Sequence, residues 1–500
     1  MGPAFGGRAH RLPTQHINFR HNSSVRAPGL PIVAACVLAC AVITSATPAV
    51  PAAQPPAGAT RITWEDAAPL GARLEKQGIT QAAFPSYVER LRENHASRMR
   101  EGDLDHLVFY LLQSTHFTSL PAIEPALSAK GLIDTLDPAE REAFLRASRV
   151  PPARIPPGVR SRAAALVRAL NSPDPDARLT YFRSLARAAF PNARRREDGI
   201  LQEYARVMRF VYEKEFVAQR SASPSVAVAE LYRTRGLSTD TAVEAGYVVY
   251  NGLGILKSLE PARTIRRVLI VGPGLDLAPR TGLLESGPPQ SYQPWAVMDA
   301  LLSLGLSRVE DLQVVAADIN PRVVDHLRRT RSDPPTLVLA SAIRDTDTVT
   351  LSADYRDYFA RLGRAIGEIE GTLAPAVGAK GQMERKVRVN GAAARALSAE
   401  TLDIVTDRLD RGGFDLVVAT NILPYFDDAE LMLAMSNVAG MLAPGGVFLH
   451  NEARPLLGEV TAALGLPFEQ SRHVVIASVR GAPAPLSDSV WLHRKVKTNP

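Results

Sequence analysis

Cysteine is nearly absent from this 500-residue chain, and its two cysteines, Cys36 and Cys40, both lie in an apolar run near the amino terminus. The rest of the sequence therefore offers no thiol pair for a disulfide, no thiolate ligands for zinc and no cysteines for an iron–sulfur cluster. The acids and histidines between residues 103 and 116 match no known metal-ligand spacing. We expect no metal site.

Acidic side chains are absent before residue 57, whereas Arg8, Arg11, Arg20 and Arg26 make this stretch basic. These four arginines supply more than half of the formal net charge of +7. The body of the chain therefore lacks the basic excess that would indicate nucleic-acid binding, and we expect no nucleic-acid partner.

An apolar run over residues 30–46 follows these arginines, and an Ala/Pro-rich stretch continues to residue 59. This order is typical of a secretory signal, or of an uncleaved anchor with a flexible stalk. We interpret residues 1–59 as such a leader, with membrane contact through residues 30–46 if it is not cleaved. The body is then exported or membrane-anchored, because basic residues hold the amino end in the cytoplasm. If the leader does not function, the body is cytoplasmic.

A buried strand runs into a glycine turn over Arg267-Val-Leu-Ile-Val-Gly-Pro-Gly274, and Gln313-Val-Val-Ala-Ala-Asp318 repeats the apolar pattern with a carboxylate at its end. Glycines let the backbone pass close to a ligand. Ligands of open α/β sheets sit beyond the carboxyl ends of the strands, where an aspartate can accept hydrogen bonds from a ribose diol. Gly272, Gly274 and Asp318 therefore indicate a nucleoside-containing cofactor.

The glycine turn lacks the features that would bind a phosphate. Leu277 occupies the sixth place of G-x-G-x-x-G, where a dinucleotide site needs glycine or alanine, and no Gly-Lys-Ser or Gly-Lys-Thr occurs in the chain. S-adenosylmethionine carries a ribose and a base but no phosphate, so this turn favours it. The alternative is a glycine turn in another Rossmann-like sheet.

Strands and helices alternate through the last hundred residues. Strands are predicted over residues 414–421 and 447–450, helices over about 429–442 and 454–465, and a closing antiparallel pair over 473–479 and 489–495. Asp427 or Asp428 can cap the first of these helices. The fold class is therefore α/β, a doubly wound Rossmann-like sheet with a terminal antiparallel hairpin.

At these residues the chain resembles the class I S-adenosylmethionine-dependent methyltransferases over about residues 225–500, and among them most closely the chemotaxis receptor glutamate methyltransferases. The likeness lies in residues 293–298, 317–320 and 421–426. It implies that Gly272 and Gly274 line the methionine portion of the cofactor, that Asp318 binds its ribose, and that Asn421 faces it.

The pattern departs from that family at two places in the first turn. Ile270 stands where an acid usually precedes the first glycine by two places, and Asp276 stands at the third glycine position. Asp276 is therefore a candidate for contact with the cofactor's amino group. Tyr425 and His450 are candidates for orienting or deprotonating a methyl acceptor, and their alternatives are a packing aromatic and a satisfied histidine at a strand end.

Residues 60–224 are predicted to form a helical domain, and residues 344–400 an insertion in the α/β domain of residues 225–500. Apolar residues at spacing three and four predict the helices. They cover residues 84–100, 105–113, 139–147, 160–170, 176–189 and 200–217.

Together these features predict methyl transfer from S-adenosylmethionine to a protein side chain or a small molecule. The alternative is a secreted or membrane-tethered scaffold that keeps the fold without catalysis. The leader conflicts with the enzymatic reading, because S-adenosylmethionine is made and used in the cytoplasm.

Overall fold

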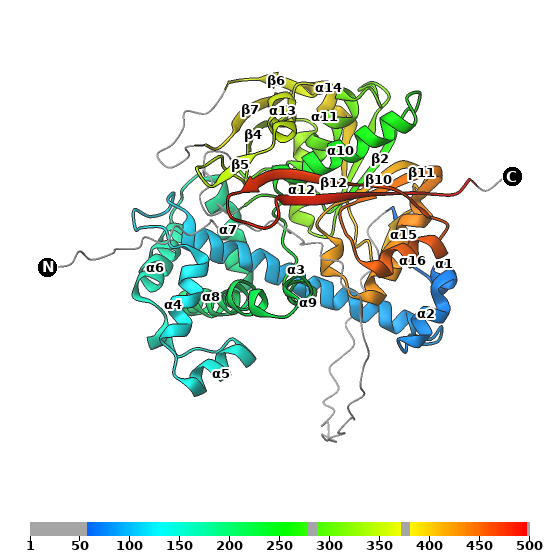
Figure 1. Ribbon diagram of the computed structural model, residues 1–500. Coiled ribbons are helices and arrows are strands. Elements are labelled where there is room, and N and C mark those ends of the chain that lie inside the picture. The colour runs from blue at the N-terminus through cyan, green and yellow to red at the C-terminus, as the bar shows by residue number, and fades with distance from the viewer. Residues whose placement is uncertain (1–57, 278–287, 372–380, 498–500) are drawn as a thin grey trace.

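A computed structural model describes residues 58–277, 288–371 and 381–497 (Figure 1). An eight-stranded sheet lies at its centre, in the order β5-β12-β13-β11-β10-β2-β3-β8. In that order the strands are Val349–Leu351, Phe468–Val479, Leu486–Arg494, Leu442–His450, Phe414–Ala419, Arg267–Val271, Gln313–Asp318 and Leu397–Thr401.

The five strands from β11 to β8 run parallel, whereas β13 is antiparallel to both β11 and β12. The chain enters the parallel set at β2 and builds outward through β3 and β8 on one side, then through β10 and β11 on the other. The order of winding therefore reverses between β2 and β10, which makes this the topological switch point. The predicted doubly wound sheet with a closing antiparallel hairpin is confirmed.

Helices cover both faces of the sheet, because alternate residues of a strand point to opposite sides. Val268 and Ile270 of β2 share one core with α10 and α11, while Leu269 and Val271 share a second core with α15 and α16. Helix α12 contacts β3 and β8. The bounds of these helices are Val243–Leu259, Gln293–Ser303, Asp428–Met441, Pro455–Ala463 and Pro321–Thr330.

The described residues between 60 and 224 are almost wholly helical, as predicted. Helices α1 to α9 are Trp64–Ala67, Gly71–Lys76, Phe84–Gln113, Pro125–Asp134, Pro138–Ala147, Pro157–Asn171, Ala177–Ala189, Arg196–Tyr212 and Pro224–Thr234. The separate helices predicted over 84–100 and 105–113 are one helix, α3. Gly102 lies inside α3 and does not break it. A Cβ at this position would lie 1.9 Å from the carbonyl oxygen of Leu237, so the close packing of that segment against α3 requires glycine.

The first described residues pack into the second core, which contains Leu269 of β2, and begin with a strand of a separate two-stranded sheet. Strand β1 (Ala59–Arg61) pairs antiparallel with β9 (Asp407–Leu409), and α1 contacts α15. Buried residues of α3, α4, α6, α7 and α8 belong to the same core as Val268 of β2. The predicted helical domain of residues 60–224 therefore shares its core with the sheet.

The segment predicted as an insertion over residues 344–400 contributes two strands to the central sheet, β5 at one edge and β8 at the other. Strand β8 pairs in parallel with β3 and ends beside it, so the insertion prediction was wrong for these residues. The remainder forms β5, α13 (Ala353–Arg361) and α14 (Gly391–Ala396), and it contributes β6 (Gly367–Ile369) and β7 (Glu384–Val389) to a three-stranded sheet with β4 (Thr336–Ala340). The sequence did not reveal this strand, because β8 has no long apolar run.

Within the described ranges, no helix is long and apolar enough to span a membrane. The leader predicted over residues 1–59 lies outside the described residues except for its last two.

Candidate functional site

A cavity opens at the switch point, beyond the carboxyl ends of β2, β3, β8 and β10. Its volume is about 760 Å³ with the solvent at its mouth included. We call it the switch-point cavity. Its lining comprises His95 and Met99 of α3, residues 237–241, Val271, Gly272, Gly274, residues 317–320, 402–404 and 420–422, Tyr425 and Phe426.

The two glycines predicted from the sequence form one wall of this cavity. Gly272 and Gly274 have φ values of 66° and 73°, in the left-handed region that favours glycine. A Cβ on Gly274 would lie 2.1 Å from the carbonyl oxygen of Thr239, and one on Gly272 would lie 2.5 Å from Cγ2 of Ile422. The turn is therefore held against both the 237–241 segment and the segment after β10.

Asp318 lines the cavity at the end of β3 and is 6% exposed. Its carboxylate accepts hydrogen bonds from the backbone N–H groups of Gly274 (3.3 Å) and Asn320 (2.8 Å). Burial raises the pKa of Asp318 to about 6, with a further increase from the charge of Asp103, although both N–H groups oppose it. Each carboxylate oxygen keeps a lone pair for a hydroxyl donor in the cavity.

Asn320, and not Asp318, caps the helix that follows β3. The Asn320 side chain caps α12 by accepting a hydrogen bond from the backbone N–H of Arg322. Its Nδ2 also donates to Asp103 of α3 over 2.9 Å. The cap and the cavity acid are therefore different residues.

Asn421 lines the cavity at the end of β10 in a left-handed conformation, with φ of 62°. Its backbone N–H donates to Oδ1 of Asn451 (2.9 Å), and Nδ2 of Asn451 donates back to its side-chain oxygen (2.7 Å). Asparagine is one of the few residues that adopts this conformation readily, and such positions cluster at functional sites.

Tyr425 lines the same cavity and stacks edge-on with Tyr232, at 5.5 Å between ring centroids. Burial raises the pKa of Tyr425 to about 12 despite the opposing charge of Arg235. The phenol therefore stays protonated at neutral pH and can donate a hydrogen bond.

Two predicted residues lie elsewhere. The carboxylate of Asp276 accepts the backbone N–H of Thr241 (3.0 Å), so it supports the 237–241 wall but is not among the described lining residues. His450 is buried beside the rings of Phe448 and His493, with centroids 4.9 and 5.1 Å away, and is also absent from the described lining. Burial and the charge of His493 lower the pKa of His450 well below its usual value. A direct catalytic role for His450 therefore does not fit its position.

Helix α3 forms a wall that the sequence did not predict. His95, Met99, Asp103 and His106 recur at helical spacing and face the carboxyl edge of the sheet. Asp103 binds Asn320, and Nε2 of His106 lies 3.1 Å from the hydroxyl of Thr239. These contacts join one face of α3 to segments that line the cavity.

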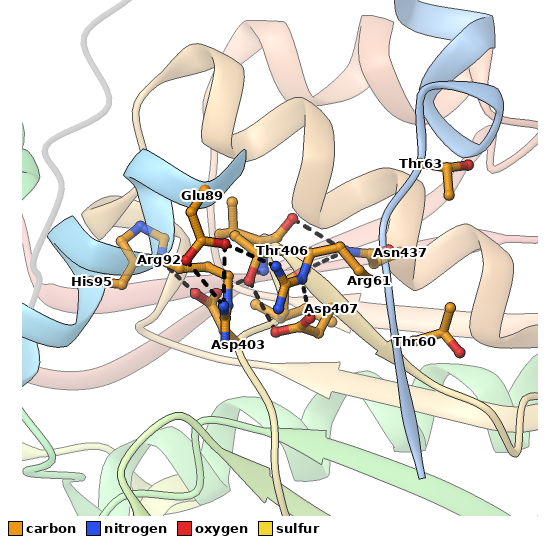
Figure 2. A network of polar contacts seen from close by, with 12 residues as sticks. Thr60, Arg61, Thr63, Glu89, Arg92, His95, Asp403, Thr406, Asp407 and Asn437 are labelled. Atoms are coloured by element: carbon orange, nitrogen blue, oxygen red, sulfur yellow. Dashed lines mark hydrogen bonds and ion pairs between the residues drawn. The ribbon is translucent and has the colours of Figure 1, made fainter. Parts of the chain in front are cut away.

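His95 is the central charged group of this wall (Figure 2). It is 2% exposed, with Nδ1 2.8 Å from Oδ2 of Asp403 and Nε2 2.9 Å from Oε1 of Glu430. Burial alone would lower the pKa of His95, but the two carboxylates raise it to about 10. The ring is therefore an imidazolium at neutral pH.

The same network reaches the amino-terminal strand. Arg61 of β1 donates to Glu89 of α3 over 3.0 Å and to Asp407 of β9 over 3.2 Å, as Figure 2 shows. Burial would raise the pKa of Asp403, but the charge and hydrogen bond of His95 lower it instead. Spacing in the sequence gave no sign of these contacts, since more than 300 residues separate His95 from Asp403.

No family model and no curated protein matches the sequence. Solved structures with a similar chain path include N-methyltransferase NodS from Bradyrhizobium japonicum, at 14% identity and a TM-score of 0.26, over 51% of this chain and 98% of that one. Magnesium protoporphyrin IX methyltransferase from Synechocystis PCC 6803 matches at 8% identity and a TM-score of 0.27, over 51% and 82%. The glycopeptide N-methyltransferase MtfA matches at 12% and 0.26, over 49% and 90%.

The strand order and directions identify the fold. The sheet is wound outward in both directions from β2, and its last strand, β13, lies antiparallel between β11 and β12. The narrower likeness to the chemotaxis receptor methyltransferases is not confirmed. The central sheet is therefore a doubly wound, Rossmann-like sheet whose last strand runs antiparallel.

Proposed function

We propose that this protein binds S-adenosylmethionine in the switch-point cavity and transfers its methyl group. The observation that carries the proposal is the convergence of Gly272, Gly274 and Asp318 on a single cavity at the switch point. Two backbone positions there permit close approach, and a buried carboxylate can accept from a ribose diol.

The order of strands suggests how the cofactor lies. Its methionine portion would sit over the glycine turn after β2, and its ribose over Asp318 at the end of β3. Because the base is attached to the far side of the ribose, it would extend toward the end of β8, where Leu402 and Ile404 supply apolar surface. The long nucleoside axis then runs across the three strand ends.

The bound cofactor would supply a methyl carbon already activated by a positive sulfur. The residues of this chain would then bind, orient and exclude water, and positioning of that kind contributes on the order of 7–11 kcal/mol in favourable cases. Tyr425, as a protonated phenol, would orient an acceptor by donating a hydrogen bond. A carboxylate acceptor would need no general base.

A neighbouring cavity is the proposed entry site for the methyl acceptor. It is lined by Asn451, Asp488 and Trp491 among others, and Asn451 also holds Asn421 of the switch-point cavity. The Asn421–Asn451 pair thus lies where the two cavities adjoin. We propose that the acceptor, a protein side chain or a small molecule, enters from this side.

Methyl transfer is tested by incubating the protein with methyl-labelled S-adenosylmethionine and separated protein and small-molecule fractions of a cell extract. Label that moves into one fraction, and fails to move with Asp318→Ala, supports the enzyme. No transfer to either fraction contradicts it. A reporter fused after Ala59 shows which side of the membrane the body occupies, and a cytoplasmic position would agree with a supply of cofactor.

A further inference from the structure

Helix α3 places an imidazole ring, flanked by two carboxylates, against one of the cavity loops. His95 bonds to Asp403 in the loop after β8 and to Glu430 in the first turn of α15. All three side chains are nearly buried, at 2%, 12% and 6% exposure. Two carboxylates around one imidazole keep it protonated, so the His95–Asp403 contact is an ion pair with fixed geometry.

Asp403 faces the region where the base would lie. It lines the cavity between Leu402 and Ile404, at the end of the strand next to the one that carries Asp318. This step rests on the proposed function, because it takes the nucleoside direction from the ribose at Asp318.

Both oxygens of Asp403 are held in place. Oδ2 accepts from His95, and Oδ1 accepts from the backbone N–H of Val405 over 3.1 Å. The Thr406 side chain is a third hydrogen-bond partner, which leaves the carboxylate at least one of its four lone-pair sites. As long as the carboxylate is ionised, it can only accept hydrogen bonds, so it matches an amino group and repels a carbonyl oxygen.

We infer that His95 is a positioning residue that makes this cavity selective for a purine with an exocyclic amino group. The imidazolium holds Asp403 ionised and fixes the direction of its free lone pairs. Without the imidazolium, burial would favour the protonated form of Asp403. A protonated carboxyl can donate to a carbonyl oxygen, so it would no longer distinguish a base with an amino group from a base with a carbonyl. The residue proposed to confer this selectivity, His95, thus belongs to α3, a helix that precedes the sheet in the sequence.

A purely structural role for His95 predicts a different result. If the ion pair only supported the loop, its removal would weaken every nucleoside ligand by the same factor. A role in selectivity changes the ratio of affinities for two ligands that differ at the base alone.

The experiment compares S-adenosylhomocysteine with S-inosylhomocysteine, in which a carbonyl replaces the amino group of the base, by calorimetric titration of the full chain. The wild type should prefer the adenine ligand by about tenfold to a hundredfold, as expected for a hydrogen bond to a charged group. His95→Gln should reduce that preference to about threefold or less, since glutamine can donate to Asp403 but carries no charge. His116→Gln is the matched control, because His116 is exposed and contacts Asp176; it should keep the wild-type ratio.

Asp403→Asn provides a second route that leaves α3 intact, since an amide can present either a donor or an acceptor to the base. It should also abolish the preference, and circular dichroism establishes that each variant is folded. An unchanged ratio in a folded His95→Gln or Asp403→Asn protein overturns the inference while leaving the proposed function standing. Failure of the wild type to bind S-adenosylhomocysteine at all overturns both.

Discussion

The carboxylate of Asp318 accepts a hydrogen bond from the backbone N–H of Gly274, 3.3 Å away, and thereby joins the end of β3 to the glycine turn after β2. The two residues are 44 positions apart in the sequence. One buried acid therefore orients the turn and still offers lone pairs to the cavity. This link places the two sequence motifs in one site.

Asp318→Asn should weaken the binding of S-adenosylhomocysteine. The amide keeps the shape but loses an acceptor for the ribose hydroxyls, so the affinity for S-adenosylhomocysteine should fall by about tenfold to a hundredfold, or roughly 1.5–3 kcal/mol. The unfolding midpoint should also fall, because the amide NH2 would face one of the two backbone N–H groups that the carboxylate accepts, so affinity is compared in the folded variant. Asp325→Asn, on an exposed side chain of α12, is the control and should alter neither quantity. Unchanged affinity in folded Asp318→Asn would remove Asp318 from the site.

Binding should weaken in mild acid. The pKa of Asp318 is raised to about 6, so the ionised acceptor is present above that pH and is lost as pH falls through it. The dissociation constant for S-adenosylhomocysteine should be constant from about pH 7 to 8 and should rise toward tenfold per pH unit below about 6. His95 does not contribute in this range, because its pKa is raised to about 10. An affinity that stays flat down to pH 5 would show that Asp318 does not meet the ligand.

Gly274→Ala should disrupt the turn. Its φ of 73° disfavours alanine, and the new Cβ would press on the carbonyl oxygen of Thr239. We expect a loss of about 1–3 kcal/mol in unfolding free energy and weaker ligand binding, measured by urea denaturation and calorimetry. Gly254→Ala is the matched control: it lies within α10 with open space around it, so it should stabilise by about 0.5–1 kcal/mol. Equal stability of the two variants would contradict the strained turn.

His450→Phe should change the response to acid without changing ligand affinity. Burial lowers the pKa values of both His450 and His493 below the usual 6.5, so these rings stay neutral when folded and gain protons on unfolding. Stability is therefore retained above about pH 6.5 and falls as the pH drops below it. Unfolding free energies at pH 7.5 and 5.5 should differ less for His450→Phe than for the wild type. A large loss of affinity for S-adenosylhomocysteine would instead show that His450 contributes to ligand binding.

Local signals in the sequence predicted much of the sheet and its caps. Continuous apolar runs marked β2, β3 and β10. Asp427, one of the two predicted caps of α15, caps that helix and forms a capping box with Glu430. The packing of Gly102 against Leu237 could not be predicted, because no local pattern contains so distant a partner. Strand β8 escaped notice because it alternates buried and partly exposed residues at the end of the sheet.

The charged wall of the site could not be predicted for a similar reason. His95 lies in a helix, where a histidine has no distinctive spacing, and its partners Asp403 and Glu430 come from the far half of the chain. Arg235 is likewise buried in an ion pair with Asp105, a residue 130 positions away in the sequence. Only the fold brings such groups together.

The most direct test of the account titrates S-adenosylhomocysteine and the dinucleotide NAD separately into the wild-type protein by calorimetry. The glycine turn lacks the features that hold a pyrophosphate, and the acid after β3 suits a ribose diol. We predict saturable binding of S-adenosylhomocysteine and none of NAD. No heat from S-adenosylhomocysteine at millimolar concentration, or saturable binding of NAD in its place, would contradict the central claim.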